Sequence, residues 1–242
     1  TCDRLGELFD WILSRQSGPA EAPWGLSISV PAPVVEVADD LEGFLQGTPA
    51  FLPGWEDVPI VETLTSRFGA PVWMRSSVET MTMGELHAGA GIGRRTMLVL
   101  KVGQRIGAGL ISQGQLYRGA LGASGLIGHL PVQVGEQSGT LDALAGSGMI
   151  ARAGLAAAEE GRSPLLSDLI TRHGGLGPIE VGQAAQMGDP AAMEILSQSG
   201  RLIGQVAATL ANMLNPELIV LAGSLAQTND VLLAALREAV YG

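Results

Sequence analysis

The order of apolar and polar residues along the chain predicts strands that alternate with helices. Apolar residues recur at helical spacing from Leu5 to Leu13, so the chain is expected to open with an amphipathic helix. Apolar runs of strand length occur in three later stretches, which read GLSISVPAPV, TMLVLKVG and ELIVLAGS. A long helix is predicted over Pro190–Leu214, with Asn215 and Pro216 ending it. Strands that alternate with helices are typical of an α/β fold.

Turn-forming residues and composition shifts add detail to this pattern. Gln113 and Gly114 separate two short strand-like stretches, so they are expected to form the turn of a β-hairpin. The alanine-rich segment Thr140–Ala158 predicts one helix or a helix pair, and Asp230–Val240 predicts the last helix. The acidic segment Val35–Phe51 has no clear period and is expected to form an irregular, exposed loop.

Composition narrows the class of protein. The chain has 242 residues and is 46% hydrophobic, which is long enough for one large core or two smaller lobes. No apolar run reaches the roughly 18 residues that span a bilayer, and no signal peptide is recognisable, so a cytoplasmic protein is expected. A single cysteine, Cys2, excludes an internal disulfide and a cysteine-rich zinc site. The net charge of −10 disfavours nucleic-acid binding by these residues, because an acidic surface repels phosphate groups.

Three short motifs give little support for a functional site. Gly89–Gly93 has the spacing of a dinucleotide-binding turn, but a predicted helix precedes it and a strand follows, which is the reverse of the required order. His87, His129 and His173 are far apart, so no local metal cluster is expected. Ser124 lacks the strand-turn-helix setting of a nucleophile. The residues therefore predict no metal and no cofactor.

The central stretch LYRGALGASGLIGHLPV resembles the signature of the ROK family (repressors, open reading frames, kinases), whose pattern is Y-R-G-A-x-G-x-x-G-E-x-G-H. The matching positions are Tyr117, Arg118, Gly119, Ala120, Gly122, Gly125, Gly128 and His129. The resemblance extends over residues 5–240, through GLSISVPAPV, LPGWEDVPIVETLTSRFGAPVWM, GTLDALAG and LNPELIVLAGSL. It implies the two-lobed α/β fold of the actin, hexokinase and heat-shock protein superfamily (ribonuclease H-like), with sugar bound between the lobes.

The resemblance also divides the chain. Residues 1–86 correspond to lobe one, which is expected without its first strands because the D-x-G-G-T strand of the family has no counterpart. Residues 87–242 correspond to lobe two, and the last helix is expected either there or against lobe one. Some members of the family phosphorylate hexoses with ATP, whereas others are transcriptional regulators with a winged helix-turn-helix ahead of this fold. Fold does not decide between these activities, so the site must.

The sugar site that the resemblance implies is degenerate in this chain. The family's Asn-Asp pair, whose Asp accepts the hydroxyl proton, aligns with Ser76 and Ser77. A serine hydroxyl is no base near neutral pH, and loss of a base costs roughly 10²- to 10⁴-fold in rate. Leu126 replaces the glutamate that accepts sugar hydroxyls, and each buried hydroxyl left without a partner costs about 1–3 kcal/mol. Gly125 is retained in the loop. Of the sugar contacts that the resemblance implies, only His129 and Asp142 remain comparably polar.

The phosphate and zinc positions that the resemblance implies have changed as well. Gln104 and Arg105 replace Thr and Gly in the phosphate turn, where a side chain crowds the approach of phosphates although Arg105 could attract an anion. Thr140 replaces the last cysteine of the family's zinc site, and the segment between His129 and Gly139 is too short for the others. His129 is left with two interpretations, as a ligand contact or as a residue that orients its loop.

These substitutions predict a catalytically inactive effector-binding and dimerisation region of a ROK-type transcriptional regulator. Its expected partners are a second copy of the chain and a sugar or other small-molecule effector, with DNA contacted only through a separate N-terminal domain. Two alternatives stay open. One is an ATP-dependent sugar kinase, and the other is a degenerate structural domain that binds no sugar, which Leu126 favours.

Overall fold

The computed structural model describes residues 2–15, 23–36, 43–45, 54–55, 58–225 and 230–242, which form two compact units. Unit 1 comprises Thr1–Met83 and Arg118–Ser124, and unit 2 comprises Gly84–Tyr117 and Gly125–Gly242. The boundary of 86 and 87 expected from the family resemblance stays a prediction. Within the described stretches, no helix combines the length and the apolarity needed to span a membrane.

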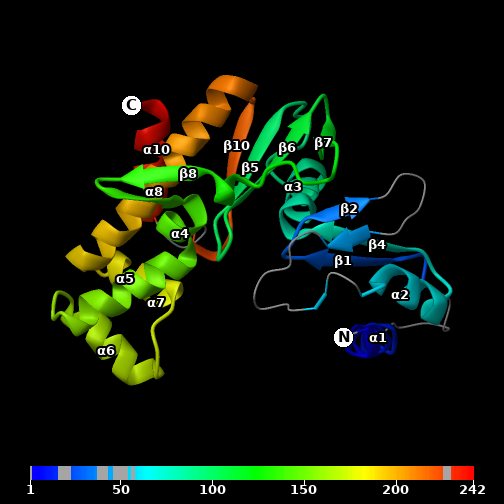
Figure 1. Cartoon of the computed structure of the whole chain (residues 1–242), viewed down its shortest axis with the longest axis horizontal. Helices are drawn as coiled ribbons and strands as arrows, with labels where there is room; N and C mark the ends of the chain where they lie inside the picture. Colours follow the sequence, from blue (N-terminus) through cyan, green and yellow to red (C-terminus); the bar gives the residue numbers. More distant parts are fainter. Residues whose placement is uncertain (1, 16–22, 37–42, 46–53, 56–57, 226–229) are drawn as a thin grey trace. The chain divides into compact units, whose positions relative to one another are not determined.

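Unit 1 is built on two parallel strands, β1 (Leu26–Val30) and β4 (Val72–Ser76). The strands alternate buried and exposed residues, and helices α1 (Cys2–Leu13) and α2 (Ile60–Phe68) lie on one side of them (Figure 1). Because a left-handed residue stops a helix, Gly69 ends α2 with φ of 63° and its N–H bonded to the last turn. The core of this unit consists of Leu26, Ile28, Val30, Ala32, Val34, Ile60, Val61, Leu64, Val72 and Met74.

One prediction for unit 1 was wrong. The segment expected to be an irregular loop contains the antiparallel strands β2 (Val34–Glu36) and β3 (Gly43–Leu45). Each strand has only three residues, which is too short to show the alternation of apolar and polar residues that predicts a strand. The acidic composition of the segment also favoured a loop. The remaining residues of that segment, with Asp39, Asp40 and the 46–51 stretch, lie outside the described residues.

Unit 2 contains a four-stranded sheet in the order β10-β5-β6-β7. Its strands are β5 (Met97–Lys101), β6 (Gly107–Ser112), β7 (Gln115–Tyr117) and β10 (Leu218–Ala222). β10 runs parallel to β5, whereas β6 and β7 are antiparallel to their neighbours. The predicted hairpin turn is confirmed, because Gln113 and Gly114 both have positive φ, at 55° and 82°.

Helices α8 (Pro190–Leu214) and α10 (Asp230–Tyr241) pack against this sheet through Leu202, Ile203 and Leu236. The long helix α8 has the predicted bounds, and Asn215 ends it in the left-handed conformation. α10 packs along α8, and Figure 1 draws the two helices side by side. The other helices of unit 2 are α4 (Leu141–Ala145), α5 (Ser147–Glu159), α6 (Pro164–His173) and α7 (Pro178–Gln186), and α3 (Ser77–Ala88) belongs partly to each unit. Helix α3 contains the boundary between the units, after Met83.

A buried polar pair joins the starts of two of these helices. Ser163 caps α6 and Asp189 caps α8, and the Ser163 hydroxyl donates to the Asp189 carboxylate at 2.7 Å. Both residues are buried, and each also accepts a backbone N–H, from Leu166 and Ala192 respectively. Because every polar atom of the pair has a partner, the pair holds α6 against α8 without an unsatisfied group.

Candidate functional site

The first candidate region, in unit 1, is the junction where β4 passes into α3. Ser76 is the last residue of β4 and lies directly before α3, and Ser77 is the first helical residue. The Ser76 N–H donates to Glu79 Oε2 at 2.9 Å, and the Glu79 N–H donates to Ser76 Oγ at 3.3 Å. This reciprocal pair is a capping box, in which the S-x-x-E spacing satisfies two amides of the first helical turn. The Ser76 hydroxyl is therefore committed to starting the helix.

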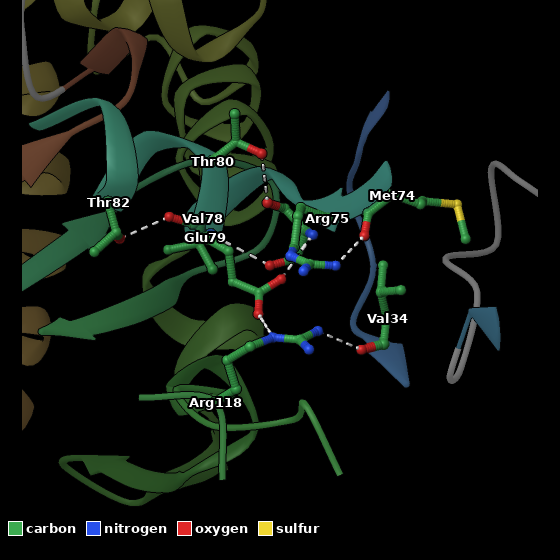
Figure 2. Close-up of polar contacts among 9 residues, drawn as sticks. Val34, Met74, Arg75, Val78, Glu79, Thr80, Thr82 and Arg118 are labelled. Carbon is green, nitrogen blue, oxygen red and sulfur yellow. Dashed lines mark hydrogen bonds and ion pairs between the residues drawn. The ribbon is translucent and has the colours of Figure 1, made fainter. Parts of the chain in front are cut away.

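A buried ion pair lies beside this capping box (Figure 2). Arg118 Nε donates to Glu79 Oε1 at 2.6 Å, and the two side chains are 18% and 8% exposed. The same guanidinium donates through Nη2 to the carbonyl oxygen of Val34 at 3.0 Å. Arg118 belongs to the motif that precedes the central loop, so this pair fastens residues Arg118–Ser124 to the junction.

These contacts limit what the junction can do chemically. A general base must offer an accepting oxygen to the proton of a substrate hydroxyl. Glu79 is the nearest carboxylate along α3, but it is only 6% exposed and each of its oxygens already accepts a hydrogen bond. Ser77 brings a hydroxyl, which is too weak a base near neutral pH. In the described part of this junction, the carboxylate thus serves the fold and is not presented as a base.

A second candidate region, in unit 2, is the loop Gly125–Leu130. Gly125 has φ of 83°, and its carbonyl accepts the Ala108 N–H at 2.8 Å, which ties the loop to β6. A single 3₁₀ turn, η1 (Ile127–His129), follows. Leu126 is 38% exposed, whereas Ile127 is 6% exposed and belongs to the core. The position at which the resemblance implies a glutamate therefore presents an apolar side chain outside the core.

Asp142, in the first turn of α4, is committed to the backbone around this loop. Its Oδ1 accepts the Ile106 N–H at 2.6 Å. The carboxylate also packs against Gly128, where an added Cβ would lie 2.2 Å from Oδ1. In turn, the Gly128 N–H donates to the Ile106 carbonyl at 3.0 Å. Asp142 thus joins the loop to the turn between β5 and β6, so its carboxylate helps to hold the backbone of the loop in place.

His129 lies at the end of η1 with its imidazole exposed. Arg105, from the turn between β5 and β6, approaches His129 with 3.4 Å between Nη1 and Nε2. A guanidinium only donates hydrogen bonds, so a bond between these two side chains requires Nε2 as its acceptor. Sequence analysis singled out both residues but did not pair them, since 24 positions separate them.

The segment after His129 forms a hairpin where the resemblance implies a zinc loop. Strands β8 (Pro131–Val134) and β9 (Gln137–Thr140) pair antiparallel and leave Gly135 and Glu136 as the turn. Backbone hydrogen bonds between the two strands therefore hold this segment together. Across the described residues, no group of three or more His, Cys, Asp or Glu side chains is arranged to hold a metal ion.

The titratable groups with shifted pKa values lie outside these two candidate regions. Backbone N–H groups of Thr96 and Arg95 lower the pKa of Glu217, whose carboxylate joins the starts of β5 and β10. Hydrogen bonds from the first turn of α7 lower the pKa of Glu180. Burial lowers the pKa of Lys101 at the end of β5. Two of the three shifts come from groups that cap or join elements of the fold, so they do not identify a catalytic acid or base.

Comparison with known proteins decides the family. The family model described as ROK family matches residues 8–241. The chain belongs to the ROK family. A glucokinase from Halalkalibacterium halodurans is 29% identical over 219 residues, which cover 82% of this chain and 66% of that protein. The DNA-binding transcriptional dual regulator NagC from Escherichia coli is also 29% identical, over 194 residues that cover 76% of this chain and 46% of NagC.

Solved ROK structures share the fold. A ROK family transcriptional regulator, described as a homologue of the E. coli MLC protein, superposes with a TM-score of 0.79 at 20% identity, covering 99% of this chain and 58% of that one. The ROK hexokinase from Thermus thermophilus gives a TM-score of 0.73 at 26% identity, covering 98% and 76%. The predicted two-lobed α/β fold of the actin and hexokinase type is thus confirmed. Kinases and regulators resemble the chain to a similar degree, so the site must separate the two activities.

The predicted site residues fall into two groups. Ser76 and Ser77 stand together in unit 1, whereas Gly125, Leu126, His129 and Asp142 belong to one loop and its support in unit 2. Their role in holding a sugar stays a prediction. Glu79 was not among the predicted site residues, and Arg118 was known only as a position of the central motif, without its partner. The S-x-x-E spacing after an apolar strand was the signal that could have found Glu79.

Proposed function

We propose that this chain is the effector-binding and dimerisation region of a ROK-family transcriptional regulator, and that it does not transfer phosphoryl groups. One observation carries the proposal. At the β4–α3 junction, where sugar phosphorylation would need a free carboxylate, Glu79 is buried and fully engaged by Ser76 and Arg118. Transfer to a sugar hydroxyl without a positioned base forfeits roughly 10²- to 10⁴-fold in rate.

Further observations support a regulator. Leu126 carries no group that could replace the missing base, and Asp142 Oδ1 already accepts the Ile106 N–H, so neither position points to phosphoryl transfer. A regulator needs only a shaped pocket whose occupancy shifts an equilibrium between conformations. The similarity to NagC and to the DNA-binding transcriptional repressor Mlc of E. coli, at 25% identity over 98% of this chain, agrees with this proposal.

We expect no sugar kinase activity. The purified chain, given Mg²⁺, ATP and either glucose, mannose or N-acetylglucosamine, should produce sugar phosphate no faster than roughly 10⁻² of a ROK glucokinase rate, because the base is missing. A coupled assay of ADP formation measures this, with the H. halodurans glucokinase as the matched positive control. Turnover comparable with that of the glucokinase would overturn the proposal and favour the second candidate, a sugar kinase, which 29% identity to that glucokinase supports.

The regulator proposal also predicts a homodimer. Light scattering after gel filtration should give twice the chain mass of 25.0 kDa. The complete gene product should retard operator DNA in a gel-shift assay, whereas the 242 residues alone, with a net charge of −10, should not. A monomeric mass for the chain would contradict the dimerisation part, and retardation of DNA by these residues alone would contradict a separate DNA-binding segment.

A further inference from the structure

The loop that carries His129 lies where the family resemblance implies a zinc site, but the residues around it do not supply a set of zinc ligands. Structural zinc takes four ligands from Cys, His and carboxylate side chains. Between His129 and Asp142, Glu136 is the only other His, Cys, Asp or Glu residue. Glu136 follows the far end of β8, so roughly 13 Å of extended strand separates it from His129. The donor set therefore does not fit the metal.

Two neighbours of the loop also disfavour a metal ion at His129. Asp142 Oδ1 already accepts the Ile106 N–H at 2.6 Å. Arg105 Nη1 stands 3.4 Å from His129 Nε2, and its positive charge repels a cation at that nitrogen. The one thiol of the chain, Cys2, packs against the core of unit 1. Another part of the fold must therefore hold the loop in place.

The β8–β9 hairpin supplies this connection. It begins at Pro131, directly after the loop, and ends at Thr140, directly before α4, and these two residues are cross-strand partners. The Leu141 N–H donates to the Leu130 carbonyl at 2.9 Å, which ties the end of the loop to the start of α4. The valine side chains of β8 pack against the core of unit 2. Backbone pairing and burial thus fix both ends of the segment.

Thr140 belongs to both the hairpin and the helix. It is the last residue of β9, and its hydroxyl accepts the Ala143 N–H at 3.3 Å as the N-cap of α4. This cap stabilises the first turn of α4, which carries Asp142. Asp142 in turn accepts the Ile106 N–H and packs against Gly128 of the loop. A series of contacts therefore runs from the hairpin through Thr140 to the loop.

We propose that the β8–β9 hairpin, fastened to α4 by Thr140, holds the loop that carries His129 without a metal ion. Thr140 is a positioning residue, because it acts on the loop through Asp142. The resemblance places Thr140 at the last cysteine of the family's zinc site, so the residue that would bind a metal caps a helix instead. The order of the loop then depends on this hydroxyl and not on zinc.

Hydrogen exchange of backbone amides, followed by NMR, tests the metal-free part of the proposal. The Ile106 N–H, bonded to Asp142, and the Gly128 N–H, bonded to the Ile106 carbonyl, report on the loop and its support. The Val102 N–H, bonded to Ala222 at 2.8 Å, reports on the sheet. Dialysis against EDTA, and zinc chloride added back, should leave all three exchange rates unchanged. Faster exchange at Ile106 and Gly128 after EDTA, reversed by zinc chloride, would overturn this part.

Two variants test Thr140 as the positioning residue. Thr140→Val keeps the size of the side chain and removes the acceptor. It should speed exchange at Ile106 and Gly128 roughly fivefold, the factor expected from the loss of an N-cap, and leave Val102 unchanged. Thr140→Ser retains the hydroxyl and should restore most of the protection. Melting curves verify that each variant folds, and the EDTA comparison needs no variant.

Thr171→Val is the matched control, because Thr171 is an exposed threonine inside α6 of the same unit. It should change none of the three exchange rates. Unchanged exchange in Thr140→Val, or no recovery in Thr140→Ser, would overturn the role of the hydroxyl. Equal acceleration at Val102 would mean that Thr140 stabilises the whole unit and would overturn its local role. No arm of the experiment uses a ligand, so each of these failures leaves the proposed regulator standing.

Discussion

Replacing Glu79 with alanine should lower the free energy of unfolding of unit 1 by about 3–5 kcal/mol. The carboxylate is 6% exposed, and its removal leaves the Arg118 guanidinium buried without its partner at 2.6 Å. The same change removes the acceptor for the Ser76 N–H, so the first turn of α3 loses its capping box. One residue therefore carries both the start of the helix and the attachment of Arg118–Ser124.

The measurement can be confined to unit 1. All four tryptophans of the chain (Trp11, Trp24, Trp55 and Trp73) belong to that unit, so the fluorescence of tryptophan during urea unfolding reports on it selectively. Circular dichroism at the helical minimum reports mainly on unit 2, which holds most of the long helices. The fluorescence transition should move to lower urea in the Glu79 variant.

Asp10→Ala is the matched control for Glu79→Ala. Asp10 also pairs with an arginine of unit 1, Arg67, but those side chains are 54% and 39% exposed. Solvent screening limits such a pair to about 0–1 kcal/mol. If both variants shift the fluorescence transition equally, burial of the Glu79 pair is not the source of its effect and the assignment fails. Arg118→Met should cost less than Glu79→Ala, because its loss leaves a carboxylate that still caps α3.

Elements whose signals lie close together in sequence could be predicted. Helix α8 begins at Pro190 after the Asp189 cap and ends at Asn215, and each of these signals acts within one helical turn. β5 was predicted because four of its five residues, Met97–Leu100, form an unbroken apolar run. The hairpin β8–β9 was not predicted, since Val132 and Val134 are its only large apolar residues and its pairing depends on packing against the core.

The candidate site was predictable only in part, for the same reason. The losses at Ser77 and Leu126 follow from aligning two motifs, which needs no structure. The Glu79–Arg118 pair spans 39 positions and Asp142–Ile106 spans 36, so neither contact is visible before the chain is folded. The lost ligand contacts could therefore be identified from the sequence. The contacts of the remaining acids could not, because Asp142 accepts a backbone N–H and Glu79 pairs with Arg118 only in the folded chain.

Replacing Gly125 with alanine should lower the free energy of unfolding of unit 2 by about 2–4 kcal/mol. Two costs add at this position. The φ of 83° is strained for a residue with a Cβ, and that Cβ would lie 1.8 Å from the carbonyl oxygen of Ala108. The obstacle is backbone of β6, which cannot rotate away as a flexible side chain would. Relief requires the loop to move off β6, which breaks the Ala108–Gly125 hydrogen bond and shifts Leu126 and His129 with it.

Gly135→Ala separates these two costs. Gly135 also has a positive φ, 56°, in the turn between β8 and β9 of the same unit, but an added Cβ there meets no atom within 4 Å. It should therefore cost only the conformational strain, about 1–2 kcal/mol. Circular dichroism during urea unfolding compares the two variants, and tryptophan fluorescence from unit 1 serves as an internal reference. Equal costs at the two glycines would mean that the loop carrying His129 is not held against β6 by the close approach of Gly125 to Ala108.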